Sequence, residues 1–326
     1  MLNFLRKKDP IVSSAVLSAN HFEPPKPLET AVLFLVFNRS DTTKEVFEAI
    51  RKARPPRLYI AGDGARTDHE GEVEKVARVR EISTAVDWPC EVKTLFREDN
   101  LGCKLAVSGG INWFFEHEEQ GIILEDDCLP SQSFFWFCEE LLTKYKNNER
   151  VMHIAGMCYQ EPNTEFSYNF VRIGGIWGWA SWKRAWKLYE PDFSSYDSAI
   201  KEKVLENVFF GNGFFVNLYR RIFSLAHKNN HTWDYQWTCT KIINNSVNIM
   251  PSVNLVENIG IGHQDATHIK DQKNPFEKVV RKELVFPLVH RKFLVIGQEN
   301  DYRNLEFSNQ VGLRKMIKYF VSKLLR

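Results

Sequence analysis

Short apolar runs alternate with amphipathic segments between residues 31 and 155. Each apolar run has the length of a strand buried on both faces, and each of the first four is followed by a segment of helical periodicity. The expected strands are 31–37, 57–61, 91–96, 121–124 and 151–155. The expected helices are 41–53, 69–86, 104–118 and 133–146. This alternation predicts an α/β fold in which a mainly parallel sheet carries helices on both faces.

After the fifth expected strand the alternation ends. A cluster rich in Gly and Trp, residues 174–182, runs into an expected helix, and helical spacing returns at 213–229 and 234–245. Residues 247–250 form a further expected strand, and the polar segment 254–273 is expected to be a loop. This second half therefore predicts a smaller region built differently from the first.

Composition excludes some classes of protein. The 43 basic and 41 acidic residues give a net charge of +2, so no overall attraction to nucleic acid is expected. No apolar run approaches the roughly 18–20 residues of a membrane-spanning helix. A cleaved signal peptide is not expected, because Asp9 and Pro10 interrupt the N-terminal apolar stretch. The six cysteines form no CxxC pair, which favours reduced thiols and a cytoplasmic protein.

The C-terminal segment 312–326 is amphipathic and basic. Its apolar residues fall on one helical face, and Lys and Arg fill the rest without any acid. Two interpretations remain open: a helix packed on the body of the protein, or a helix lying on an anionic membrane surface. The second predicts peripheral association with the inner face of the cell membrane.

Three consecutive acids, Glu125-Asp126-Asp127, follow the fourth expected strand. Adjacent carboxylates repel one another, and they persist most readily where a cation compensates. Carboxylate oxygens suit Mg²⁺ and Mn²⁺, which take their other ligands from water and phosphates. The position at the carboxyl end of a buried strand favours a metal–diphosphate site. The alternative is a solvated acidic turn.

Two other strand ends carry polar side chains. Arg39 follows the first strand and can stack on a base or reach a phosphate; the alternative is a surface ion pair. Asp63 stands between two glycines after the second strand and can accept from a base N–H or a ribose hydroxyl; the alternative is a plain turn. Both should lie at the same sheet edge as the acidic triplet.

Arg97, Asn100 and Lys104 follow the third strand at that edge, and Lys104 can reach a phosphate or sugar. Their alternative role is to start the next helix. In the Gly/Trp cluster, Trp177 is the expected acceptor contact, because indole faces stack on sugar rings, whereas Trp182 is expected in the core.

These residues carry a resemblance to the nucleotide-sugar half of GT-A glycosyltransferases, and to the N-acetylglucosaminyltransferase I family in particular. That family has Asn-Arg-Ser, Asp-Gly and Glu-Asp-Asp after successive strands, followed by a helix with Phe-Phe. The corresponding residues here are Asn38-Arg39-Ser40, Asp63-Gly64, Glu125-Asp126-Asp127 and Phe134-Phe135. The Trp-Gly-Trp of the cluster is similar to bacterial GT-A proteins labelled hemolysin-like. The resemblance covers about residues 31–270.

The resemblance implies a GT-A-like, Rossmann-related mixed sheet and a nucleoside-diphosphate sugar bound through Mn²⁺ or Mg²⁺. Arg39 and Asp63 would hold the nucleoside, expected to be uridine, and Asp126 would contact the ribose. Asp127 would be the metal ligand, and Glu125 would face the sugar or the active-site water.

The resemblance also extends to the second half of the chain. Trp233-Asp234 is similar to the segment that supplies the family's catalytic base, which implies Asp234 for an inverting transfer. From the residues alone, Asp192 and Asp197 are the other candidate acids, and a helix N-cap is the alternative role for Asp234. His268 matches a histidine of the family's closing loop, with phosphate contact and metal ligation both open.

The predicted function is transfer of a sugar from a nucleoside-diphosphate sugar to a glycan or lipid-linked acceptor in surface polysaccharide synthesis. One alternative is a nucleotidyltransferase acting on sugar phosphates, although residues 37–41 lack the usual Gly-rich, Lys-bearing loop. The other is an inactive carbohydrate-binding protein. The expected regions are an extension (1–28), a nucleotide-sugar-binding half (29–156), an acceptor-binding half (157–275) and a C-terminal extension (276–326).

Overall fold

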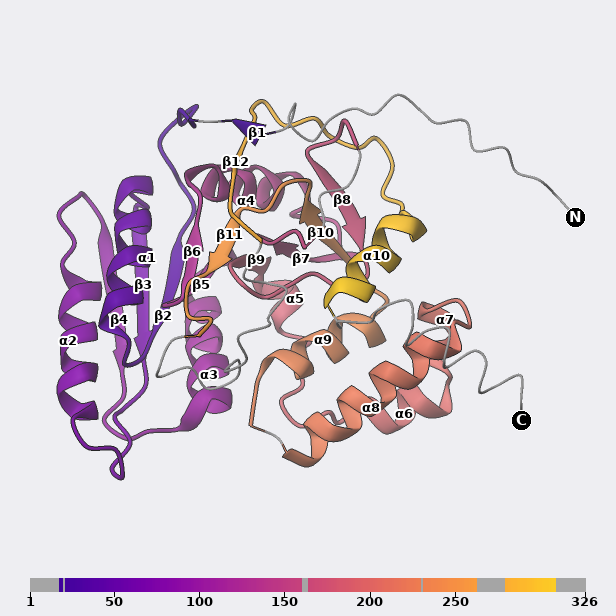
Figure 1. The fold of residues 1–326 in the computed structure, drawn as a ribbon, viewed down its shortest axis with the longest axis horizontal. Coiled ribbons are helices and arrows are strands. Elements are labelled where there is room, and N and C mark those ends of the chain that lie inside the picture. The colour runs from indigo at the N-terminus through magenta and orange to yellow at the C-terminus, as the bar shows by residue number, and fades with distance from the viewer. Residues whose placement is uncertain (1–17, 20, 160–163, 230, 263–278, 309–326) are drawn as a thin grey trace, which may run out of the picture.

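The computed structural model describes residues 18–19, 21–159, 164–229, 231–262 and 279–308 (Figure 1). The strands are β1 (Ser18–Ala19), β2 (Val32–Val36), β3 (Arg57–Gly62), β4 (Glu91–Phe96), β5 (Gln120–Glu125), β6 (Cys128–Pro130), β7 (Val151–Ala155), β8 (Tyr168–Val171), β9 (Trp179–Trp182), β10 (Val247–Pro251), β11 (Val256–Asn258) and β12 (Glu283–Leu284). The helices are α1 (Ser40–Ala53), α2 (Glu72–Thr84), α3 (Gly102–His117), α4 (Gln132–Lys144), α5 (Lys183–Trp186), α6 (Tyr196–Lys201), α7 (Val204–Val208), α8 (Gly213–Asn229), α9 (Asp234–Ile243) and α10 (Gln298–Ser308).

Eight strands form one mixed sheet in the order β4-β3-β2-β5-β9-β7-β10-β8. The first four are mutually parallel, whereas β9 is antiparallel to both β5 and β7. The α/β fold with a mixed sheet is thus confirmed, and both halves of the chain contribute strands to the same sheet. The Gly/Trp cluster differs from expectation, because Trp179–Trp182 forms strand β9 before the short helix α5 begins.

Alternate residues of β2 serve opposite faces of the sheet, as the period of two in a strand requires. Val32, Phe34 and Val36 pack in the core cluster that α1, α2 and α4 cover. Leu33 and Leu35 pack in a second cluster with side chains of α3, α5 and α9. Helices therefore cover both faces, and α6–α9 gather beside α10 at one end (Figure 1). Burial on both faces explains why β2 is a continuous apolar run.

The segment before β2 was expected to be a linker, and the structure corrects this. Phe22 and Leu28 are buried in the core, and the indole of Trp136 donates to the carbonyl of Lys26 at 2.8 Å. Strand β1 pairs with β12, so residues from both ends of the described chain meet beside α4.

The segment 254–273 also differs from the predicted loop where it is described, because β11 pairs antiparallel with β6, directly after the acidic triplet. The amphipathic segment 312–326 lies outside the described residues. Within the described ranges, no helix has both the length and the apolar character needed to cross a membrane.

Candidate active site

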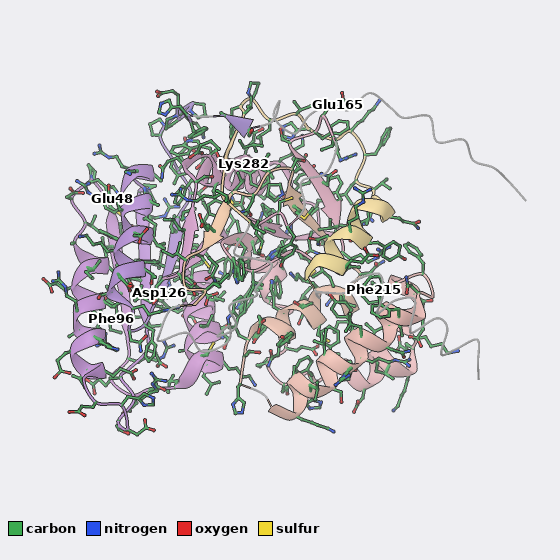
Figure 2. All side chains as sticks on the ribbon, in the orientation of Figure 1. Glu48, Phe96, Asp126, Glu165, Phe215 and Lys282 are labelled. Atoms are coloured by element: carbon green, nitrogen blue, oxygen red, sulfur yellow. The ribbon has the colours of Figure 1, made fainter. Side chains whose placement is uncertain are left out.

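A cavity of about 590 Å³ opens at the carboxyl ends of β2, β3 and β5. One wall is built by the residues that follow these strands, and the start of α3 forms a second. The start of α9, the segment before β9 and the residues after β11 complete it. Eight of the predicted site residues line this cavity: Arg39, Asp63, Asn100, Glu125, Asp126, Asp127, Trp177 and Asp234. Figure 2 labels Asp126 among the side chains of this region.

The Arg39 guanidinium bridges two of the three acids. Its Nη2 lies 2.5 Å from Asp126 Oδ1 and its Nη1 lies 2.9 Å from Asp127 Oδ2. Burial alone lowers the pKa of Arg39, but the Asp126 and Asp127 carboxylates outweigh it, so the net shift is upward. Arg39 therefore stays charged and acts as the internal cation of the acidic triplet.

Burial raises the pKa of Glu125, and the negative charges of Asp127, Asp126 and Asp234 raise it further. Burial likewise raises the pKa of Asp126, although Arg39 opposes that shift. Three full negative charges are thus disfavoured in this cavity, and the triplet gains from any additional positive charge.

The donor chemistry of the triplet fits a hard divalent cation, because carboxylate oxygens are its preferred ligands and a guanidinium already stands in for a cation. In the described part of the chain, no three His, Cys, Asp or Glu side chains are grouped so as to hold a metal ion. A cation bound here would therefore take most of its ligands from water and from a diphosphate, as Mg²⁺ commonly does.

Asp63 has a structural role that the sequence did not reveal. Its carboxylate accepts hydrogen bonds from the backbone N–H groups of Leu101 (3.0 Å to Oδ1) and Gly102 (2.9 Å to Oδ2), and so caps α3. Asn100 Nδ2 donates to the carbonyl of Gly64 at 2.7 Å. A Cβ at Gly64 would lie 2.3 Å from the carbonyl oxygen of Glu98, so only glycine fits there. These contacts join the ends of β3 and β4 into one wall.

Arg97 and Lys104 are not among the residues that line the cavity. On α3 the lining residues Cys103, Ala106 and Val107 share one helical face, and Lys104 falls on another. The Arg97 guanidinium instead packs beside Gly109 on α3, 2.7 Å from where a Cβ would stand. The structure therefore does not bring these two predicted donor contacts to the site.

Asn38 of the Asn-Arg-Ser motif is buried and donates to Glu72 Oε1 at 2.8 Å. Arg66, which lines the cavity and was not predicted, pairs with the same carboxylate. Burial raises the pKa of Glu72, but hydrogen bonds from Arg66 and Asn38 reverse this and lower it to about 2. Glu72 is thus a fixed anion behind the cavity wall.

Asp234 approaches the cavity from the second half of the chain. It is the first residue of α9, whereas the N-cap position belongs to Trp233, so the predicted capping role is not observed. Its charge is close enough to raise the pKa of Glu125. The other two candidate acids, Asp192 and Asp197, are exposed and do not line the cavity.

Trp177 and Tyr235 are among the aromatic side chains that line the cavity. Trp177 lines it and is partly buried against the core, and Tyr235 lines it with 41% of its surface exposed. Trp182 lies in the core, as expected, with its indole donating to the carbonyl of Leu142 at 3.1 Å.

Several lining residues carried no signal in the sequence. Asn258 and Gly260 reach the cavity only because β11 pairs with β6, a long-range contact. Cys103 reaches it because α3 starts at Gly102, two residues before the start of the expected helix at residue 104. His268, the other predicted metal ligand, lies outside the described residues.

No family model matches the chain, and no curated protein matches its sequence. Among solved structures, apo UDP-glucose pyrophosphorylase aligns with a TM-score of 0.39 and 9% identity, over 72% of this chain and 94% of that one. The galactosyltransferase LgtC, in complex with donor and acceptor sugar analogues, aligns with a TM-score of 0.29 and 10% identity, over 53% and 65%. Below a TM-score of 0.5 such likenesses assign no residue of this site.

Proposed function

We propose that the chain is a metal-dependent inverting glycosyltransferase that uses a nucleoside-diphosphate sugar. One observation carries this proposal: Asp234 shares a single cavity with the acidic triplet, although the two are more than 100 residues apart in sequence. A site that only bound nucleotide would need the triplet and Arg39 alone. An added carboxylate from the second half of the chain supplies what a transfer reaction requires.

The residues after β2, β3 and β5 form the proposed donor side. Asp127, together with diphosphate oxygens, would hold Mn²⁺ or Mg²⁺, which neutralises the charge that develops on the leaving diphosphate. Asp126, which Arg39 and the backbone N–H of Phe37 (3.1 Å) hold in place, would be the residue that accepts from a ribose hydroxyl, as the family resemblance implies. Uridine is the nucleoside that the sequence motifs favour.

Asp234 is the proposed general base. In a single in-line displacement the acceptor hydroxyl attacks from the side opposite the leaving group, so the base must stand away from the metal-binding carboxylate. Trp177 and Tyr235 line the same cavity and suit stacking against sugar rings, which supports a glycan or a lipid-linked glycan as acceptor.

The direct test supplies UDP-sugars and Mn²⁺ to the purified chain together with a cell-derived glycan extract. Sugar transfer with release of UDP, and inversion at the anomeric carbon seen by NMR, is the expected result. Release of pyrophosphate from a nucleoside triphosphate and a sugar phosphate would instead identify a nucleotidyltransferase. Undiminished transfer in excess chelator would remove the metal from the proposal.

A further inference from the structure

We propose that Arg39 is an internal counter-ion that competes with the divalent cation for Asp127, and that cation binding moves one arm of its guanidinium off that carboxylate. This inference rests on the proposed metal-dependent function. It gives Arg39 a role before a cation binds, in addition to any contact with a nucleotide.

The first support is the two-armed contact. Nη2 engages Asp126 and Nη1 engages Asp127, so each arm of one guanidinium serves a different carboxylate. The exposed fractions of the three side chains are only 17% (Arg39), 4% (Asp126) and 16% (Asp127). Removing one partner from charges buried to this degree leaves an uncompensated buried charge, so either carboxylate left alone would be costly.

The two arms of the Arg39 guanidinium differ in how easily a cation can displace them from their carboxylates. The second donor to Asp126 is the backbone N–H of Phe37, 3.1 Å from Oδ2, whereas the second donor to Asp127 is the Cys128 thiol, a weak donor that lies 3.4 Å from Oδ1. Asp127 is the residue that the family resemblance implies as the metal ligand, and its Oδ2 accepts from Arg39 Nη1 at 2.9 Å. A cation at Asp127 therefore displaces one arm, while the other arm keeps Arg39 on Asp126.

Packing around Asp127 leaves little room for a cation and Arg39 Nη1 to contact its carboxylate at the same time. The backbone of Gly260 lies against the ion pair, and a Cβ there would stand 2.6 Å from both Arg39 Nη1 and Asp127 Oδ2. Gly260 is fixed in turn, since its N–H donates to Asn258 Oδ1 at 2.9 Å and the N–H of Ile259 donates to the carbonyl of Asp127 at 2.8 Å. With that side filled, a cation that reaches Oδ2 takes the place of Nη1.

The backbone of Arg39 cannot move to relieve the competition. Its carbonyl accepts from the backbone N–H of Thr43 at 3.0 Å and from the hydroxyl of Thr43 at 2.5 Å, at the start of α1. Displacement of Nη1 from Asp127 is thus a rotation of the Arg39 side chain while its Cα stays in place. The released arm remains in the cavity, where an arriving diphosphate supplies a new anionic partner.

The test measures Mn²⁺ binding without nucleotide at pH 8, by titration calorimetry and by the EPR signal of free Mn²⁺. Arg39→Met should bind Mn²⁺ about tenfold more tightly than the wild type, because the competing arm no longer lowers the fraction of binding-competent sites. Arg39→Lys, which cannot span both carboxylates, should fall between them. It also covers the case in which Arg39→Met fails to fold.

Arg66→Met is the matched control, because Arg66 lines the same cavity but pairs with Glu72. It should bind Mn²⁺ within about twofold of the wild type, which separates direct competition from a general loss of positive charge. Mn²⁺ should also raise the melting temperature of the Arg39 variants by more than it raises that of the wild type, since only the variants hold unpaired carboxylates before binding.

Equal or weaker Mn²⁺ binding in both Arg39 variants would overturn the inference, and would show that Arg39 only positions the carboxylates. Absence of Mn²⁺ binding in every variant without nucleotide would overturn the competition, and absence of binding with UDP present as well would also overturn the metal site. Tighter binding in the variants, with no sugar transfer by the wild type, would uphold the competition and overturn the proposed function alone.

Discussion

Trp237 and His153 are joined by a buried hydrogen bond in which the indole Nε1 donates to the imidazole Nδ1 at 3.3 Å. The imidazole Nε2 therefore carries the hydrogen and donates to the carbonyl of Gly175 at 2.9 Å. Burial lowers the pKa of His153 well below its usual value, so the ring is neutral. Lys241 Nζ donates to the neighbouring carbonyl of Gly174 at 3.4 Å. These hydrogen bonds connect helix α9, which begins at Asp234, to the segment that precedes Trp177.

The buried Lys241 predicts a pH dependence of stability. Burial lowers the pKa of its ammonium group from 10.5 to about 7. Between pH 7 and 10.5 the unfolded chain holds a proton that the folded chain lacks, so the free energy of unfolding should rise with pH by up to about 1.4 kcal/mol per unit. This stability is lost as pH falls towards 7.

Urea unfolding at pH 7, 8 and 9 checks that expectation. Lys241→Met should flatten the rise, whereas Lys201→Met, at an exposed position of α6, should leave the slope of the wild type unchanged. An identical slope in the wild type and Lys241→Met would show that Lys241 titrates normally in the folded state.

Asp63 should contribute to stability through α3, independently of any ligand. Asp63→Ala removes the acceptor for the N–H groups of Leu101 and Gly102 and should lower the free energy of unfolding by about 1–2 kcal/mol. Chemical denaturation measures this, with Asp68→Ala, at an exposed aspartate, as the control. If the two variants are equally stable, the Asp63 contacts to α3 contribute nothing measurable.

Cys103 offers a chemical probe of the cavity. It is the one exposed cysteine of the six, and it lines the cavity. Desolvation at the cavity wall and the nearby Glu125 carboxylate raise the pKa of its thiol to about 12, so alkylation by iodoacetamide should accelerate between pH 7 and pH 9.

UDP with Mn²⁺ should slow the alkylation of Cys103 several-fold at pH 9, as measured by mass spectrometry of the modified peptide. Cys90, which is partly buried and away from the cavity, serves as the internal control. Equal rates with and without UDP and Mn²⁺ would place the nucleotide elsewhere.

Asp127→Asn should leave the fold intact and abolish donor turnover. Asparagine has nearly the same shape but no negative charge, so it holds a divalent cation weakly and no longer balances Arg39. Circular dichroism checks the fold, and UDP release checks turnover. Full turnover by a folded Asp127→Asn protein would contradict the assignment of Asp127 as metal ligand.

The strands of the first half follow closely from the sequence, since the predicted strand 91–96 coincides with β4 and the predicted strand 57–61 ends one residue before β3. Local apolar runs suffice for β2, β3 and β5, because these strands are buried on both faces, whereas β4 is a partly exposed edge strand. The carboxyl-end rule likewise brought Arg39, Asp63 and the triplet together.

Long-range pairing could not be predicted in the same way. The insertion of β9 between β5 and β7, and the pairing of β11 with β6, depend on contacts between distant segments that leave no local period. The same limit explains why the role of Asp63 in capping α3 was not predicted. Its Asp-Gly pattern indicated a turn or a ligand contact, whereas its hydrogen-bond partners lie 38 and 39 residues further along the chain.

Asp234 gives the most decisive prediction, because its two possible roles respond differently to one substitution. As a general base, Asp234→Asn should lower kcat by about 10²–10⁴-fold, because the amide cannot take the acceptor proton, while donor binding stays intact. If Asp234 only favours the start of α9 by its charge, the same change should lower the free energy of unfolding by about 0.3–1 kcal/mol and should change kcat little. Asp197→Asn is the matched control, since Asp197 lies in the first turn of α6 and away from the cavity.

Single-turnover kinetics and calorimetry of UDP binding separate the two roles of Asp234. A large loss of kcat with unchanged UDP affinity assigns the base, and the anomeric configuration of the wild-type product must then be inverted, because a single carboxylate opposite the leaving group permits one displacement only. Near-normal kcat in a stable Asp234→Asn protein, or a product with retained configuration, would require a different base. Asp192, another acid considered for this role, is exposed and away from the cavity, so it would not take the place of Asp234.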